Sequence, residues 1–193
     1  SVGIITANTG INVVANGINV QAGILTAKNI IDASDAQYNT RVGGNAGNSF
    51  DGTNAEHNTL IGYNAGTAIT DGDRNTAVGS NALITNTTGS QNTAIGMNAL
   101  YTNTTGSHNT AVGENALSLS TTSDANTAVG DEALEANTTG ASNTACGKGA
   151  LASNTTASNN TAVGTDALVG NTTGSENVAV GKEALYTNNA SNN

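Results

Sequence analysis

The apolar residues of this chain recur at a spacing of seventeen residues. The motif Asn-Thr-Ala-Val-Gly, with close variants, begins at eight places that are separated by this interval without a slip. These first residues are Asn58, Asn75, Asn92, Asn109, Asn126, Asn143, Asn160 and Asn177. An earlier unit begins at Asn39 and carries a two-residue insertion around Phe50 and Gly52. A strict period of this kind indicates that every unit repeats one structural turn.

We number the positions of each unit from 1 to 17, starting at its first Asn, and the consensus is N-T-A-V-G-x-x-A-L-x-x-N-T-T-G-x-x. The segments N-T-A-V-G and A-L-x-x are typical of two short strands, each closed by a turn signal. A helical hairpin is disfavoured, because it needs roughly twice this length per repeat and apolar spacings of three and four. The sequence therefore predicts an all-β fold: a parallel β-solenoid or β-roll of 17-residue coils, with nine units over residues 39–193.

Strand alternation predicts which positions face the interior of a coil. We expect the branched residues at position 4 and the leucines at position 9 to face each other inside, as two structural ladders. The position-4 ladder contains Val78, Ile95, Val112, Val129, Val163 and Val180, together with Ile61 and Cys146, which we interpret as a small core residue. The position-9 ladder contains Leu83, Leu100, Leu117, Leu134, Leu151, Leu168 and Leu185.

The same alternation directs positions 3 and 8 outward, yet both are almost always alanine. An exposed surface would tolerate Lys, Glu or Ser there, so a column restricted to Ala indicates close approach of another protein surface. A single chain with so few large apolar side chains also buries little apolar surface, and this burial does not offset the conformational entropy that the chain loses on folding. We therefore predict that position 8 forms subunit contacts through Ala82, Ala99, Ala116, Ala133, Ala150, Ala167 and Ala184.

Three further columns have structural interpretations. Asn at position 1 can form a hydrogen-bonded amide ladder from coil to coil. A second Asn ladder is expected at position 12, through Asn86, Asn103, Asn137, Asn154, Asn171 and Asn188. Gly at position 5, from Gly62 to Gly181, predicts a turn with positive φ.

Residues 1–38 follow a different pattern. Gly3, Gly10, Gly17 and Gly23 each precede Ile, which gives short β-branched stretches broken at six or seven residues. This pattern is typical of a β-rich connector or shaft segment, or of a cap that protects the first coil from edge-to-edge pairing.

Composition and charge exclude several classes of function. The chain has five basic against fourteen acidic residues, a formal net charge of −9, no Trp and no Pro. This balance disfavours nucleic acid and anionic membranes as partners. The longest apolar runs are only a few residues, so no membrane insertion is expected. The single Cys146 excludes an intrachain disulfide.

No group of residues predicts catalysis, a cofactor or a metal. His57 and His108 both fall at position 17, a variable turn position that favours solvated side chains. Asp71-Gly72-Asp73 suggests a calcium turn, but the nine-residue calcium-roll repeat is absent. Tyr63, Tyr101 and Tyr186 are scattered, which favours an unconstrained surface over a receptor site. We predict that the protein is not an enzyme.

Two sets of residues carry a resemblance to known families. Residues 92–96 (N-T-A-I-G) and 177–181 (N-V-A-V-G) resemble the strand motif of trimeric autotransporter adhesin heads of the YadA type. The fuller unit, such as residues 103–113, resembles repeats in phage tail-fibre proteins, and the Gly-Ile-Asn-Val segments resemble tail-fibre repeats of marine cyanophages. The resemblance implies a homotrimer of parallel β-rolls, left-handed in the adhesin heads, although the unit here is longer than the usual adhesin-head repeat.

Three functions follow as expectations. The first is a structural segment of a phage tail fibre, a rigid trimeric spacer that contacts other fibre or virion proteins at its ends and supports host attachment. The second is a bacterial surface adhesin head that binds matrix, a cell-surface receptor or glycan. These two place the protein in a virion or on an extracellular surface. A third, ice binding through the position-2 Thr column, is disfavoured because that column is expected to share the inward direction of position 4.

Overall fold

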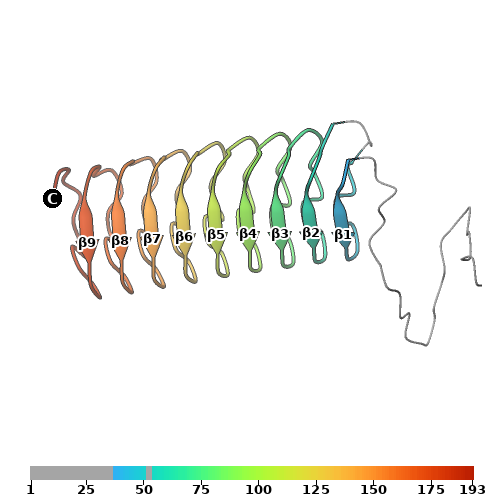
Figure 1. Ribbon diagram of the computed structural model, residues 1–193. Helices are drawn as coiled ribbons and strands as arrows, with labels where there is room; N and C mark the ends of the chain where they lie inside the picture. The colour runs from blue at the N-terminus through green and yellow to red at the C-terminus, as the bar shows by residue number, and fades with distance from the viewer. Residues whose placement is uncertain (1–36, 51–53) are drawn as a thin grey trace, which may run out of the picture. The chain divides into compact units, whose positions relative to one another are not determined.

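The computed structural model describes residues 37–50 and 54–193, which form one stack of coils (Figure 1). Each coil contributes one three-residue strand, and the strands pair side by side in chain order, all parallel. They are β1 (Thr40–Val42), β2 (Thr59–Ile61), β3 (Thr76–Val78), β4 (Thr93–Ile95), β5 (Thr110–Val112), β6 (Thr127–Val129), β7 (Thr144–Cys146), β8 (Thr161–Val163) and β9 (Val178–Val180). The predicted parallel β-solenoid is confirmed.

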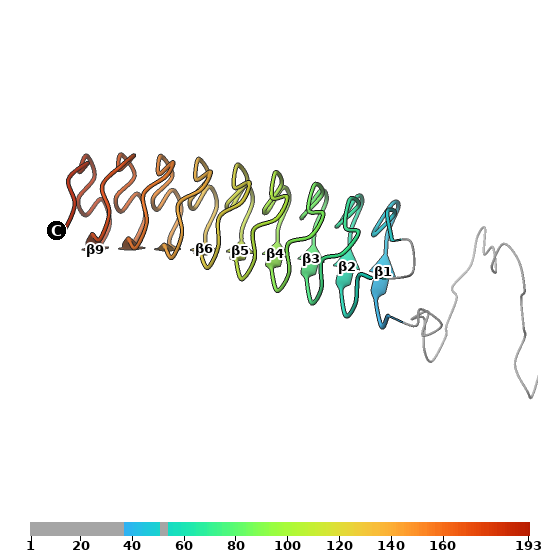
Figure 2. The ribbon, with the colours of Figure 1, turned by 90° about the horizontal axis from the view of Figure 1, so that it is seen from above.

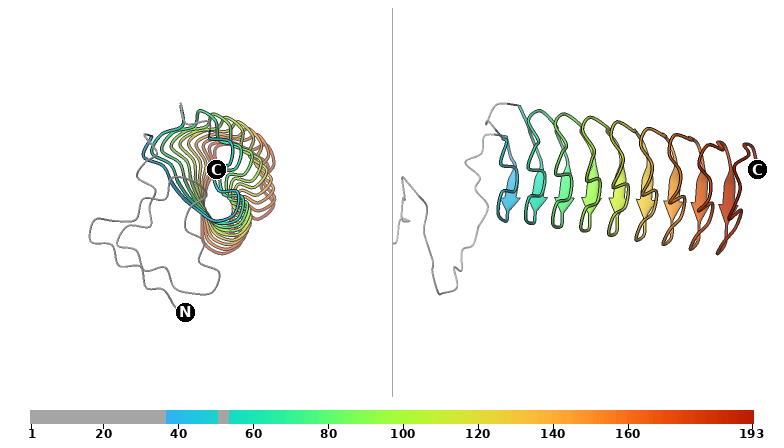
Figure 3. Two further views of the ribbon diagram at one scale, coloured as in Figure 1. Left: turned by 90° about the vertical axis from the view of Figure 1, so that its right-hand side faces the viewer. Right: turned by 180° about the vertical axis from the view of Figure 1, so that it is seen from behind.

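The repeat sets the register of the sheet. Thr76 pairs with Thr93 and Val78 with Ile95, so each position meets the same position one coil later. The insertion in the first unit is absorbed outside the strand, because Thr40 still pairs with Thr59. Seen along the stack, the coils nest with a gradual sideways shift (Figure 3). The second predicted strand, A-L-x-x, is wrong: positions 8 to 11 form a turn.

The core lies inside the coils, and it contains the alanines of positions 3 and 8 that are predicted to face outward. Position 3 faces inward: Ala77, Ala94 and Ala111 are completely buried within the chain. Position 8 is equally buried from Ala82 to Ala167, and Ala184 is partly buried. These alanines therefore pack in their own coil and have no surface left for a second subunit. In these coils the Leu at position 9 fills the interior, so the inward side chain at position 3 is limited to the methyl group of Ala.

The Leu ladder at position 9 lies inside as predicted, but by an unexpected route. Leu83 to Leu168 are completely buried, and Leu185 of the last coil is 38% exposed. Their φ angles lie between 50° and 54°, in the left-handed region that costs a non-glycine residue roughly 1–2 kcal/mol. The burial of a whole leucine side chain, about 1.5–3 kcal/mol, offsets this strain.

Glycine at position 5 has the predicted positive φ, from 124° to 144°. A Cβ on Gly113 would lie 2.4 Å from the carbonyl oxygen of Gly130 in the next coil. Adjacent coils therefore approach too closely at this corner for any side chain, and only Gly fits in each unit that another coil follows.

Buried asparagines hold the coils together, as predicted for position 1. The Oδ1 of each such Asn accepts the backbone N–H of the equivalent Asn in the next coil at 2.8–3.0 Å. The Nδ2 donates across the coil to the position-15 carbonyl, as in Asn75 to Gly89 at 2.9 Å. Asn193 continues this ladder after a last coil of sixteen residues, because its N–H donates to Asn177 Oδ1. Backbone polar groups that a thin coil buries are thus satisfied by side-chain amides.

The predicted connector, shaft or cap segment at 1–38 lies outside the described residues, apart from Gln37 and Tyr38. Among the residues that the structure does describe, no helix has the length and apolar character needed to cross a membrane.

Candidate functional site: the outward face of the sheet

The most regular exposed feature of the molecule is the outward side of the nine-stranded sheet. From β2 to β9 each strand directs its middle residue inward and its two outer residues outward, whereas Arg41 in the middle of β1 is exposed. We call the two resulting columns, position 2 and position 4, the outward face. Position 2 contributes Thr40, Thr59, Thr76, Thr93, Thr110, Thr127, Thr144, Thr161 and Val178, and position 4 contributes Val42, Ile61, Val78, Ile95, Val112, Val129, Cys146, Val163 and Val180.

This direction corrects the expectation that position 4 points into the coil. Ile61, Ile95, Val129 and Val163 are 38–39% exposed, and Val180 of the last strand is 71% exposed. Val78 and Val112 are half-buried. Cys146 is exposed and is therefore not a core residue. The position-4 residues do stack as a ladder, but they line the surface of the coil.

The threonine column also faces outward, contrary to expectation. Its members are half-buried, and Thr144 is exposed. The β-methyl groups of Thr and the branched residues at position 4 give the outward face a largely apolar surface with a row of hydroxyls along it. No charged residue lies on this face, in contrast to the two edges that flank it.

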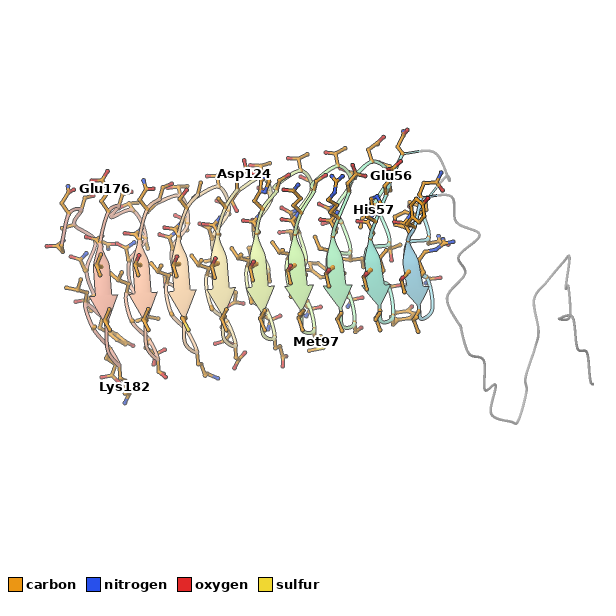
Figure 4. The ribbon with its side chains drawn as sticks, viewed as in Figure 1. Glu56, His57, Met97, Asp124, Glu176 and Lys182 are labelled. Atoms are coloured by element: carbon orange, nitrogen blue, oxygen red, sulfur yellow. The ribbon has the colours of Figure 1, made fainter. Side chains whose placement is uncertain are left out.

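Charges gather on both edges of the outward face. Figure 4 shows Glu56, Asp124 and Glu176 along the edge before the strands, and Met97 and Lys182 along the edge after them. On the second edge, Lys148 Nζ pairs with Asp131 Oδ2 at 2.7 Å, from one coil to the next. The hydrogen bond to Asp131, and the charge of that carboxylate, raise the pKa of Lys148. An apolar strip bordered by solvated charges has the arrangement of a protein interface.

The other candidate residues are not brought together. His57 and His108 are exposed at the turn, and Tyr63, Tyr101 and Tyr186 are exposed and lie in separate coils. Tyr38 stacks on His57, with ring centroids 5.3 Å apart. Within residues 37–50 and 54–193, no three His, Cys, Asp or Glu side chains converge to hold a metal ion.

The Asn ladder at position 12 explains the Asn-Thr-Thr sequence. Asn103 Nδ2 donates to Asn86 Oδ1 at 2.8 Å and to the Gly106 carbonyl at 3.0 Å. Asn-Thr-Thr is also an acceptor sequence for N-glycosylation. Asn86 and Asn103 are completely buried, so neither has room for a glycan in the folded coil. The structure also contains a Ser and Asp ladder at position 16 that sequence reasoning missed, in which Ser90 N–H donates to Ser107 Oγ at 3.1 Å. The recurrence of Ser at that position was the available signal.

Comparisons with protein-family models, with curated proteins and with solved structures give no match to this chain.

Proposed function

We propose that this chain is a rigid spacer segment of a homotrimeric fibre, of the kind found in phage tail fibres, and that the outward face is where the three copies meet. The observation that carries this proposal is the uncharged apolar ladder at position 4, which lies on the outward face from β1 to β9. Monomeric soluble proteins rarely leave a continuous apolar strip of this kind uncovered.

The occupant of the outward face is a further copy of the same chain. The ladder repeats once per coil along a parallel sheet, so a partner must offer apolar groups at the same interval over nine strands. A second copy of this chain meets that condition at every strand. Closed symmetry then buries the strip on all copies, whereas an unmatched partner would leave part of it in water.

A spacer role is supported by the way the coils are joined. Every junction carries parallel backbone hydrogen bonds and the buried position-1 Asn link. Such a stack resists bending and stretching. The resemblance to tail-fibre and adhesin repeats favours the same role, with recognition by other parts of the assembly.

The molar mass of the full chain by light scattering, with circular dichroism on the same peak, tests the proposal. We expect a folded β species at three chain masses. Val129→Lys should lower this mass, because the substitution places three ammonium groups in one apolar contact. Thr139→Lys is the matched control, since Thr139 is exposed at position 14, outside the outward face, and it should leave the mass unchanged.

Cross-linking through Cys146 is a second test, and it uses the native chain without any substitution that could impair folding. In an in-register trimer the three exposed thiols lie at the same level of the outward face, so a short bis-maleimide should join two chains of the native protein. Cys146→Ser combined with Thr122→Cys moves the thiol to position 14 and should abolish this product. A folded native monomer without cross-links would overturn the trimer.

A second candidate function, ice binding, is favoured by one observation: the position-2 Thr column lies outward beside position 4 on one regular face. Ice would then occupy the outward face in place of the other copies. A folded monomer that shows thermal hysteresis, with the effect lost in Thr110→Lys, would favour this function. A trimer without hysteresis favours the fibre.

A further inference from the structure

We propose that the stack consists of two cooperative units that separate at the junction between residues 125 and 126. We call residues 39–125 the N-terminal coils and residues 126–193 the C-terminal coils. The inference goes beyond the spacer role and does not depend on the number of copies.

The position-13 Thr hydroxyls donate to the equivalent carbonyl of the next coil from Thr70 to Thr172, and this ladder runs on without a break, like the position-1 Asn ladder. Three further side-chain ladders are present in only part of the stack. At position 7, the Nδ2 of each Asn donates to the Oδ1 of the next, from Asn45 to Asn115. At position 12, buried amides link Asn86 to Asn103 and Asn137 to Asn171. At position 16, backbone N–H groups donate to the Ser or Asp side chain of the next coil.

All three ladders are interrupted at the 125/126 junction. The position-7 ladder ends at Asn115, because the next coil has Glu132. At position 12, Ser120 replaces the Asn, so the amide link to Asn137 in the next coil is missing. The position-16 ladder stops at Asp124, because Ala141 has no acceptor side chain. Every other junction between described coils keeps at least one of the three links, and the 91/92 junction keeps all of them.

In the coil before the junction, Ser120 and Ser123 stand in place of the usual position-12 Asn and position-15 Gly. Ser120 Oγ bonds to Ser123 Oγ at 2.5 Å, inside one coil. Asn137 Nδ2 reaches across the junction to Ser123 Oγ at 3.3 Å, longer than the 2.8 Å amide link between Asn86 and Asn103. The buried amide-to-amide link at position 12 is therefore replaced by this single, longer amide-to-hydroxyl bond, and the links at positions 7 and 16 have no replacement at their own positions.

Charge adds to the weakness of this junction. Residues 109–142 contain five carboxylates and no Lys, Arg or His: Glu114, Asp124, Asp131, Glu132 and Glu135. Glu114 and Asp131 occupy position 6 in the two coils that meet there, so like charges stack across the junction. The cation that pairs with Asp131, Lys148, comes from the coil on the far side.

In a stack whose coils contact only their neighbours, stability is a sum of coil and junction terms. A junction that lacks three links and carries repulsion is the place where cooperativity breaks, so the two units open independently. A fibre segment built this way yields at one defined level when it is pulled or denatured.

Hydrogen exchange on the full native chain in mild denaturant tests the proposal. Leu117 N–H bonds to Ala133 and Glu132 N–H to Glu114 across the 125/126 junction, whereas Leu83 and Asn98 make the equivalent bonds across 91/92. We expect the first pair to exchange at least about tenfold faster, a factor that corresponds to 1.4 kcal/mol. Equal protection of the two pairs would overturn the proposal.

A repair variant and a transfer variant sharpen the measurement. Glu132→Asn with Ala141→Ser restores two of the three ladders and should reduce the difference between the two pairs. Asn98→Glu with Ser107→Ala removes the same two links at 91/92 and should accelerate exchange of Leu83. If the repair changes protection evenly along the stack, the junction is not a boundary and the proposal fails.

Discussion

The second coil and the coils that follow it have the same backbone but different interiors. In residues 75–91 the interior is filled by Ala77, Leu83 and Asn86 at positions 3, 9 and 12. In residues 58–74 the same positions carry Leu60, Gly66 and Ile69, and all of these residues are buried. Gly66 has a φ of 56°, close to the 52° of Leu83, so the chain path is retained while the side chains change.

The difference teaches that positions 3, 9 and 12 share one space. A Cβ on Gly66 would lie 2.7 Å from Leu60 Cδ2 and 2.8 Å from Ile69 Cδ1. Leu60 and Ile69 thus occupy the volume that a leucine at position 9 fills elsewhere. The first coil repeats this solution with Gly47, where the Arg41 guanidinium lies 5.5 Å from the centre of the Phe50 ring.

The largest effect is expected from removing the leucine where nothing replaces it. Leu83→Gly leaves a cavity beside Ala77, and we expect a loss of about 3 kcal/mol in the free energy of unfolding, because relief of left-handed strain offsets part of the cavity cost. Chemical denaturation of the full chain measures it. The triple variant Ala77→Leu, Leu83→Gly, Asn86→Ile copies the second coil and should recover most of the loss. A triple variant no more stable than Leu83→Gly would contradict the shared space.

The reverse change overfills the second coil. Gly66→Leu places a Cβ within 3 Å of two side chains, and we expect a loss of about 2 kcal/mol from overpacking. Adding Leu60→Ala and Ile69→Asn restores the usual interior and should return the denaturation midpoint toward that of the native chain. If Gly66→Leu alone is neutral, the interior of this coil is looser than the contacts indicate.

Much of the fold could be predicted because repetition itself carries the information. A 17-residue period predicts stacked coils, parallel pairing in register, the Leu ladder and the position-1 Asn ladder, and the structure has all of these. The period states which residues are equivalent. It does not state which side of a three-residue strand is inside.

The prediction of which strand positions face inward is wrong, because the bulk of a side chain is not a sign of burial in this coil. Position 4 accepts Val, Ile or Cys, whereas position 3 is restricted to Ala in most coils, and the restricted column is the interior one. Leu60 was the available signal, since it coincides with Gly66 and Ile69 in a single unit. Leu83 shows why alternation fails beyond the strand: its left-handed backbone directs the side chain inward at a turn.

The smallest effect is expected from a change of charge at position 10. This position is Thr67 in the second coil and Glu135 in the coil of residues 126–142. Partial burial raises the pKa of Glu135, and the nearby Glu132 and Asp131 carboxylates raise it further. A folded-state pKa above the unfolded value means that the folded chain binds the proton more tightly. The contribution of Glu135 to stability therefore improves as the pH falls through its folded pKa and is lost as the pH rises above it.

Glu135→Gln removes this titration while keeping the shape of the side chain. We expect the variant to be slightly more stable than the native chain at pH 7 and to lose that advantage as the pH falls toward 4.5, the ordinary value for Glu. Denaturation midpoints of both chains at pH 7 and at about pH 4.5 measure the difference. Glu176→Gln is the matched control for the loss of one negative charge, because Glu176 is an exposed carboxylate on the other edge. A native chain that is the more stable of the two at pH 7 would mean that the Glu135 carboxylate is stabilised by a partner, and the like-charge account of this coil would be wrong.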